Sequence, residues 1–424
     1  MTDIHDRLEE LRDSGLYRRM RLISGPQGPR VLLDGKPVLL LCSNNYLGLA
    51  DHPRVREAAA DAAMRWGVGA GASRLISGNM TVHRRLEKEL AAFERTEACV
   101  LFGSGYLANA GVVSALAGEG DVVFSDQLNH ASIVDGCRLA RAETFVYDHL
   151  DMDHLEWGLS EAGGRGSLIV TDGVFSMDGE RAPLEDIVEL AGLYDARVMV
   201  DEAHATGALG PGGRGSVADA GLEEEVDVII GTLGKALGSY GAYACCDRAM
   251  AHYLINTART LIFSTALPPP AAAGAMAALE LLREEPARVD KLRRNARVLR
   301  EALADEGVAT GASETQIVPL IAGDPEGAVA MSERALAGGV FAQAIRPPTV
   351  PEGTSRLRLT VMAGHTKTEL RSAARTLALA ARHAGVEAFE LPRMAEGRAS
   401  EPVEEPILIE PGGPRFFDQV AEAA

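Results

Sequence analysis

The sequence lacks the features that mark membrane, secreted and nucleic-acid-binding proteins. No apolar run is long enough to span a bilayer, and the N-terminus, MTDIHDRLEELRDSGLYRR, is charged from its start, with no apolar signal core. Five cysteines show no metal-ligand spacing, and their odd number argues against a disulfide framework. The net charge of -18 argues against a nucleic-acid surface and against anionic membranes. We therefore expect a cytoplasmic protein with no metal, nucleic-acid or membrane partner.

Lysine is scarce, at five residues among 42 basic ones. Lys235 alone lies between two mostly apolar runs, 226–230 and 242–246, and is ringed by glycines. The others lie in a turn, on polar helical faces and at a helix start: Lys36, Lys88, Lys291 and Lys367. Glycines allow a close approach of backbone to ligand, and a lysine amine removed from water has a lowered pKa and can form a Schiff base with an aldehyde. Lys235 is therefore a candidate catalytic residue, although most lysines are solvated surface charges.

Short apolar runs alternate with helical periods between residues 98 and 246. Each run is apolar throughout, as in strands that are buried on both faces. We expect strands at 98–102, 121–125, 167–172, 197–201 and 227–232. The alternation predicts an α/β fold with a mostly parallel sheet flanked by helices, in which ligands bind beyond the carboxyl ends of the strands.

The break LPPP at 267–270 separates this pattern from a smaller α+β segment that ends in a helix near 367–384. We divide the chain into four parts. They are an N-terminal arm (1–45), a large α/β domain (46–268), a smaller C-terminal α+β domain (269–385) and an acidic, proline-rich extension (386–424). The composition of the extension is typical of a loosely attached tail.

A nucleotide-hydrolysing or ligand-binding protein on the same kind of sheet is the rival from a different class. GTLGKA resembles a phosphate-binding loop, and VDEAH (200–204) resembles the acidic box of some helicases. That loop pattern needs glycine where Ile229 stands and Ser or Thr where Ala236 stands. The sequence therefore disfavours this alternative.

Polar residues follow several of the expected strands. Asp201 closes the run RVMVD, where a carboxylate points into the ligand crevice, and His204 follows three residues later. Beside pyridoxal phosphate, Asp201 would keep the ring nitrogen protonated and His204 would bond the ring hydroxyl; the alternative for Asp201 is a helix cap. FGSGYLANAG (102–111) opens a helix whose N–H groups can hold a phosphate. His130, in the next strand's loop, is placed to stack on the ring, although a lone histidine is more often structural.

Many ordered stretches resemble the α-oxoamine synthase family of fold-type I pyridoxal-phosphate enzymes, over about residues 16–385. The matching stretches are SNNYLGL (43–49), GAGASRLISG (69–78), HRRLE (83–87), NHAS (129–132), TDGVFSMDGERAPL (171–184), VDEAHATG (200–207), GTLGKALG (231–238), FSTALPP (263–269) and IRPPTVPEGTSRLRLT (345–360). The residues after about 386 have no counterpart in this family.

The resemblance implies a role for each matched residue. Lys235 would bind the pyridoxal aldehyde and move protons, with Asp201 at the pyridine nitrogen, His130 on the ring, His204 at its phenolic oxygen and Ser176 near that oxygen or the substrate. The phosphate would be held by Gly105, Tyr106 and Thr232, and by Ser264 and Thr265 of the partner subunit. The substrates would be held by Asn44 and Arg358 at the amino-acid carboxylate and by Arg18 and Thr349 near the acyl thioester, with Arg19 and Arg21 as alternatives to Arg18.

The resemblance also implies substrates and a homodimer with shared active sites. RPPTVPEGTSRLRLT (346–360) favours the branch that condenses L-alanine with a pimeloyl thioester in biotin biosynthesis. An acyltransferase that uses glycine and a short acyl-CoA remains the alternative, because it has the same lysine, aspartate and histidines. The sequence leaves open whether the acyl carrier is CoA or a carrier protein.

Overall fold

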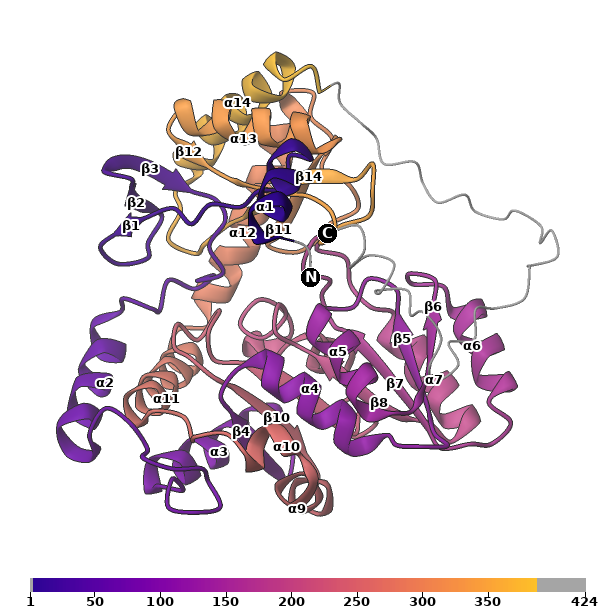
Figure 1. Ribbon diagram of the computed structural model, residues 1–424. Coiled ribbons are helices and arrows are strands. Elements are labelled where there is room, and N and C mark those ends of the chain that lie inside the picture. The colour runs from indigo at the N-terminus through magenta and orange to yellow at the C-terminus, as the bar shows by residue number, and fades with distance from the viewer. Residues whose placement is uncertain (1–2, 387–424) are drawn as a thin grey trace.

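The computed structural model of the chain describes residues 3–386, and a seven-stranded sheet forms its centre (Figure 1). The strand order is β4-β10-β9-β8-β7-β5-β6, and within this sheet only β10 runs against the others. The strands are β4 (Ala98–Phe102), β5 (Val122–Asp126), β6 (Glu143–Tyr147), β7 (Ser167–Asp172), β8 (Arg197–Asp201), β9 (Val228–Thr232) and β10 (Ala242–Cys246). The predicted mostly parallel α/β architecture is thus confirmed.

Side chains of each strand alternate between two cores, one on each face of the sheet. Val100 and Phe102 pack into one core, and Cys99 and Leu101 pack into the other. The helices of the first face are α4 (Gly105–Leu116), α5 (Ala131–Ala140), α9 (Arg248–Thr257) and α10 (Arg259–Ile262). The second face packs against α2 (Pro53–Trp66), α3 (Thr81–Glu94), α6 (Met152–Glu161), α7 (Leu184–Tyr194), α8 (Ser216–Ala220) and α11 (Pro269–Glu284). A short 3-10 helix, η1 (Pro211–Gly213), precedes α8.

A second, smaller unit lies above the large sheet in Figure 1. It contains an antiparallel sheet in the order β11-β14-β13. Its elements are α12 (Ala287–Asp305), β11 (Ile317–Gly323), α13 (Pro325–Ala337), β13 (Gln343–Ile345), β14 (Ser355–Thr360) and α14 (Lys367–His383). α12 and α13 both pack against α14, whereas α11 packs against α2 and α3 of the large unit.

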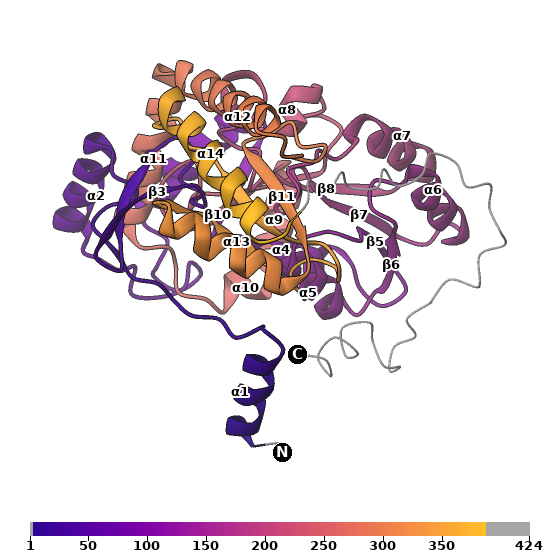
Figure 2. The same cartoon turned by 90° about the horizontal axis from the view of Figure 1, so that it is seen from above.

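The N-terminal residues join the smaller unit rather than the large sheet (Figure 1). β12 (Val340–Phe341) pairs in parallel with β3 (Lys36–Leu40), and β3 continues to β2 (Arg30–Leu33) and β1 (Ile23–Ser24). α1 (Ile4–Asp13) stands away from the body of the molecule in Figure 2, and none of its residues is buried. The sequence therefore brings residues 23–40 and 340–341 into one small sheet.

The predicted extension lies, apart from Val386, outside the described residues. Within residues 3–386, the helices are all too short or too polar to cross a membrane. The same residues contain no cluster of three or more histidine, cysteine or acidic side chains arranged to hold a metal ion.

Candidate active site

The carboxyl ends of the central strands bring most of the predicted site residues to one edge of the sheet. β8 ends at Asp201, and its register partner on β7 is Asp172. β9 ends at Thr232, and Lys235 follows three residues later. This is the edge at which an open α/β sheet binds its ligands.

Lys235 lies at one end of a continuous hydrogen-bonded chain, which we call the lysine network. Its Nζ is 2.7 Å from Nε2 of His204, and Nδ1 of His204 is 2.6 Å from the Tyr46 hydroxyl. That hydroxyl donates to Oδ1 of Asn44 at 3.1 Å, and the same oxygen accepts from Nη1 of Arg358 at 3.1 Å. The network comprises Lys235, His204, Tyr46, Asn44, Arg358 and Ser176, whose carbonyl oxygen accepts from Nε of Arg358. It joins an amine to a guanidinium through neutral groups.

Charge and burial set the protonation states in this network. Burial lowers the pKa of Lys235 to about 8, and the charge of Asp201 opposes that shift. Burial, followed by the charges of Lys235 and Arg358, holds the pKa of His204 well below its usual range. His204 is therefore neutral, and a protonated Lys235 donates to Nε2. The ring proton then belongs on Nδ1, which donates to Tyr46 while Tyr46 donates to Asn44.

A second chain of contacts, the aspartate network, lies on the sheet side of the site. Asp201 is buried, and its Oδ2 accepts from Nδ2 of Asn109 at 2.6 Å while its Oδ1 accepts from the Ala203 backbone at 2.8 Å. Nδ2 of Asn109 also donates to Ser132, whose hydroxyl lies 2.6 Å from Nδ1 of His130. The network comprises Asp201, Asn109, Ser132, His130 and Asp172, which accepts the His130 backbone N–H at 2.9 Å.

The aspartate network tests whether the site suits pyridoxal phosphate. Within the described residues, neither Asp201 nor Asp172 makes a direct ion pair, and burial together with the charge of Asp201 raises the pKa of Asp172 well above its usual range. The site thus holds buried negative charge without a contacting cation, which is costly unless a cation binds there. A ring with a protonated nitrogen supplies that cation, so the residues fit the group.

The residues predicted for the phosphate lie around the start of α4 and the end of β9. Gly105 is the first residue of α4, where backbone N–H groups lack intrahelical partners, and the space beside its Cα is open. Tyr106 follows it, half-exposed, with its hydroxyl bonded to Asp135. The Thr232 hydroxyl accepts the Gly234 N–H at 3.2 Å. These groups offer N–H and hydroxyl donors of the kind that bind phosphate, at the same edge of the sheet as Asp201.

Ser264 and Thr265 do not join either network within the chain. They lie between α10 and α11, and Thr265 is exposed and forms an isolated bridge with Ser73. Phe263 beside them is 72% exposed and Ile76, in the loop of Ser73, is 80% exposed. The predicted role of Ser264 and Thr265 in a partner's site therefore stays a prediction.

β14 carries two arginines, and both are buried. The alternation of SRLRLT allows a solvated face for Arg356 and Arg358, but all six residues of β14 are buried. Arg356 forms an ion pair with Asp178 and donates to the Thr354 carbonyl at 2.8 Å, whereas Arg358 reaches the lysine network. β14 lies between β11 and β13 and packs against α13, and the loop after β7 meets its two arginines. The strand's own pattern does not reveal these contacts.

Arg18 and Thr349 lie apart from the two networks. Both are exposed, and both lie near Arg346: Arg18 lowers its pKa, after the larger effect of burial, and the Thr349 N–H donates to its carbonyl at 3.1 Å. A cleft of about 400 Å³ beside them is lined by Tyr17, Glu326 and Arg346 among others. The two alternatives to Arg18 contact other groups, since Arg19 lies over the Tyr17 ring and Arg21 pairs with Asp34.

Sequence reasoning missed several residues of the two networks. Asn109 and Ser132 sit on α4 and α5, and Tyr46 lies within a stretch quoted only for its family likeness. Gln316, just before β11, donates to the His204 carbonyl at 2.7 Å and so fixes that residue from the smaller unit. For Asn109, a signal was present in the sequence, because it is a polar residue among the apolar buried residues of α4.

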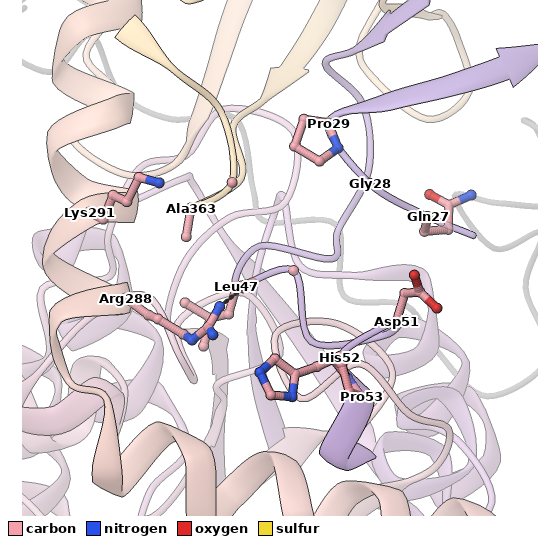
Figure 3. Close-up of a pocket in the computed structure, with 12 residues that line it drawn as sticks. Gln27, Gly28, Pro29, Leu47, Asp51, His52, Pro53, Arg288, Lys291 and Ala363 are labelled. Atoms are coloured by element: carbon pink, nitrogen blue, oxygen red, sulfur yellow. Dashed lines mark hydrogen bonds between the residues drawn. The ribbon is translucent and has the colours of Figure 1, made fainter. Parts of the chain in front are cut away.

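Another cleft, of about 370 Å³, lies behind the loop that carries Asn44 and Tyr46. Figure 3 shows Arg288 and Lys291 of α12 on one side of it and Gln27 and Asp51 on the other. None of the predicted site residues lines this cleft. The chemistry described above therefore lies outside it.

The fold and the site residues fit a pyridoxal-phosphate enzyme, and a comparison with known sequences supports this class. The sequence model of the aminotransferase class I and II family matches residues 36–377. The chain belongs to this family and, within it, to the α-oxoamine synthases, which are fold-type I enzymes that depend on pyridoxal phosphate.

The chain is also similar to individual proteins of this family. The 8-amino-7-oxononanoate synthase of Citrifermentans bemidjiense is 54% identical over 377 residues, which cover 88% of this chain and 97% of that protein. Among solved structures, serine palmitoyltransferase from S. paucimobilis with a bound PLP–myriocin aldimine has a TM-score of 0.86 and 32% identity, covering 90% of this chain and 98% of that one. The 8-amino-7-oxononanoate synthase from Francisella tularensis has a TM-score of 0.71 and 25% identity, covering 82% and 98%.

Proposed function

We propose that this chain catalyses the decarboxylating condensation of L-alanine with a pimeloyl thioester. The products are 8-amino-7-oxononanoate, CO₂ and the free carrier thiol, as a step of biotin biosynthesis. The name and high identity of the Citrifermentans bemidjiense relative support this choice of substrates. All five cysteines are free, which fits a reducing compartment, so we assign the reaction to the cytoplasm.

The observation that carries the proposal is the lysine network. It connects the Lys235 amine, through His204, Tyr46 and Asn44, to the guanidinium of Arg358. A pyridoxal-phosphate enzyme that removes the Cα proton of an amino acid uses an amine that can exchange protons near neutral pH, together with a group that binds the carboxylate. A planar guanidinium does this in two-pronged geometry, and a lysine with a pKa of about 8 is suited to proton exchange.

Pyridoxal phosphate, when bound, supplies an aldehyde that joins amines covalently and a ring that withdraws electrons from the bonds at Cα. We propose that Lys235 would bond to its aldehyde, that Asp201 would contact its ring nitrogen and that His130 would stack on its ring face. His204 and Ser176 are assigned to its phenolic oxygen. Its phosphate is assigned to Gly105, Tyr106 and Thr232, together with Ser264 and Thr265 of the partner subunit.

The residues of the chain perform the remaining tasks. Arg358 and Asn44 hold the alanine carboxylate, which fixes the bond at Cα that faces the ring. Lys235 accepts the Cα proton, and neutral His204 receives a hydrogen bond from its amine in the state without substrate. Asp201 holds a proton on the ring nitrogen through its negative charge. Arg18 and Thr349 are assigned to the acyl thioester. Its carbonyl carbon forms a bond to Cα of alanine while its bond to sulfur breaks and the carrier thiol leaves, and the alanine carboxylate is then lost as CO₂.

The homodimer belongs to the same proposal. Exposed apolar residues lie beside Ser264 in the chain and in the loop of Ser73, which pairs with Thr265, and they are the kind of surface that a second copy covers: Leu75, Ile76 and Phe263. We expect an inactive Lys235→Ala chain and an inactive Thr265→Ala chain to regain activity when they are mixed and allowed to form heterodimers. Full activity in an isolated monomer would contradict the shared site.

A product assay tests the reaction itself. Purified protein loaded with pyridoxal phosphate is incubated with pairs of amino acids and acyl thioesters, and the products are identified by mass spectrometry. The panel contains L-alanine, glycine and L-serine with pimeloyl-CoA, acetyl-CoA and palmitoyl-CoA. We expect 8-amino-7-oxononanoate from alanine and pimeloyl-CoA at a kcat/KM well above every other pair. A preference for glycine and acetyl-CoA would assign the chain to a sister acyltransferase instead.

A further inference from the structure

His149 lies between two carboxylates outside both networks. It lies two residues after β6, its Nδ1 is 2.8 Å from Oδ1 of Asp126, and its Nε2 is 3.0 Å from Oε2 of Glu180. The side chain of His149 is 15% exposed and that of Asp126 is 1% exposed. A histidine with a carboxylate at each nitrogen donates from both only when it carries a positive charge.

The surroundings fix this charge. Burial alone would lower the pKa of His149, but hydrogen bonds to Asp126 and Glu180 and their charges raise its pKa to about 9. The neighbouring acidic groups on its own segment face elsewhere, because Asp148 pairs with His154 and Asp151 caps α6. Asp126 is itself held by the Leu128 and Leu150 N–H groups. Nδ1 of the His149 ring is therefore held by Asp126 of β5, and its Nε2 contacts Glu180.

Glu180 belongs to the loop 173–182, which follows β7. The loop closes on itself through two backbone bonds, from the Phe175 N–H to the Glu180 carbonyl at 2.9 Å and from the Gly179 N–H to the Phe175 carbonyl at 2.8 Å. The edge of Phe175 also meets the His149 ring, with centroids 4.4 Å apart and planes at 88°. His149 thus contacts the loop at two points, Phe175 and Glu180, and Ser176 lies between them in the chain.

The same loop meets β14 on its other side. The Ser176 carbonyl accepts from Nε of Arg358, and the Asp178 carboxylate pairs with Arg356. Gly179 has a φ of 73°, and a Cβ there would lie 2.5 Å from the Ile317 carbonyl oxygen of the smaller unit. The loop is therefore clamped between His149 on the large unit and the two arginines on the smaller unit.

We propose that His149 is a positioning residue for amino-acid binding: through Glu180 and Phe175 it holds the loop 173–182 so that the Ser176 carbonyl aims the Arg358 guanidinium at the substrate carboxylate. His149 touches neither substrate nor cofactor in this account. The role of Arg358 is part of the proposed function, on which the inference rests. The expected signature of losing His149 is weaker binding of the amino acid with little change in binding of the thioester.

The variants His149→Gln and Glu180→Gln test this, with His154→Gln as the matched control. His154 is the next histidine along the chain, and it pairs with Asp148 rather than with the loop. We expect His149→Gln to raise the KM for L-alanine about tenfold or more, because a small misplacement of a positioning group is costly. The KM for pimeloyl-CoA, and both constants in His154→Gln, should stay within about twofold of the wild type.

A double-mutant cycle separates this account from a general loss of structure. If His149 acts through Glu180, the double variant should raise the alanine KM hardly more than His149→Gln alone, because the two changes remove one shared contact. Multiplicative effects of the two changes would overturn the proposal. So would equal effects of His149→Gln on the two KM values, which are the mark of a merely destabilised protein.

A readout without catalysis distinguishes failure of the inference from failure of the proposed function. Arg181 is exposed within the loop, so trypsin can report how firmly the loop is held. We expect cleavage after Arg181 to be several-fold faster in His149→Gln and unchanged in His154→Gln. Unchanged cleavage in His149→Gln would overturn the clamp, whatever the substrates prove to be. A wild type that acts on another amino acid would refute the proposed function, and the KM comparison would then be made with that amino acid.

Discussion

The lysine network and the aspartate network divide the site into two unlike halves. The aspartate network draws its residues from 109–201, on neighbouring strands and on two helices of one face of the sheet. The lysine network draws on residues from 44 to 358, so it forms only when the two units lie together. One half carries buried negative charge and the other carries Lys235 and Arg358. In the proposed function, the ring nitrogen and the ring face are assigned to the half fixed by the sheet, whereas the aldehyde, the phenolic oxygen and the substrate carboxylate are assigned to the half assembled across the units.

The largest effect is expected at the amine where the charges of the two halves meet. Lys235→Ala should lower turnover roughly a thousandfold or more, since it removes the group that moves the Cα proton. The variant should still bind pyridoxal phosphate, without a covalent bond, as measured by its absorption spectrum. Lys291→Ala, which changes an exposed lysine of α12, should leave turnover within about twofold. Substantial turnover in Lys235→Ala would remove the lysine from the centre of the mechanism.

The next effect separates the two carboxylates of the aspartate network. Asp201→Asn keeps the shape of the side chain but removes its charge, so turnover should fall roughly a hundredfold to a thousandfold. Asp172→Asn should cost less than about tenfold, because burial and the charge of Asp201 raise the pKa of Asp172 well above its usual range and so disfavour its charged form. Steady-state turnover of both variants measures the difference. Similar losses of turnover in the two variants would show that Asp172 matters as much as Asp201.

The third effect separates the two arginines of β14. Arg358→Lys should weaken alanine binding roughly a hundredfold, because a charge-assisted pair contributes about 2–3 kcal/mol. Arg356→Lys should weaken alanine binding by only about tenfold. Its main effect should be a lower free energy of unfolding, since it disturbs the buried pair with Asp178. Alanine titration of the cofactor's absorption, with deuterium exchange at Cα, reports binding and proton removal. Equal, small effects would make Arg358 a structural arginine like its neighbour.

The smallest effect concerns the clamp at His149, and it depends on pH. The folded-state pKa of His149, about 9, lies above its ordinary value of 6.5. Its contribution to stability is therefore complete below about pH 6.5 and is lost as pH rises through about 9. We expect the wild type to lose on the order of 1–3 kcal/mol of its advantage over His149→Gln across that range. Urea unfolding at several pH values measures it, and parallel curves for the two proteins would argue against a charged His149.

Local patterns predicted the sheet side of the molecule well. The apolar runs that became β4, β7 and β8 were placed with their observed bounds, and β5 and β9 were placed within one residue, because strands buried on both faces are apolar throughout. β6 was missed because it lies at the edge of the sheet and most of its residues are only half-buried. The reversed direction of β10 was also missed, although too few residues separate it from β9 for a helical crossover.

Candidate site residues could be predicted only where a residue type was unusual for its local sequence. Lys235 stood out as a rare lysine among glycines, and Asp201 as a charge at the end of an apolar run. Tyr46 and Gln316 have no such local signal, and Asn109 has only a weak one as a polar residue among apolar ones, because the importance of all three comes from contacts between segments that are far apart in the chain. The pairing of Arg356 with Asp178 and the clamp at His149 are likewise tertiary contacts, which a strand or loop pattern cannot encode by itself.

The most direct test of the central claim is to identify the lysine that binds the cofactor. The protein is loaded with pyridoxal phosphate, reduced with borohydride and digested, and the labelled peptide is sequenced by mass spectrometry. Borohydride makes the bond between the cofactor and the lysine permanent, so the label reports the native partner. The account predicts a single labelled peptide containing Lys235, with no label in the Lys235→Ala variant. A label on Lys36, Lys88, Lys291 or Lys367, or none on the wild type, would contradict it.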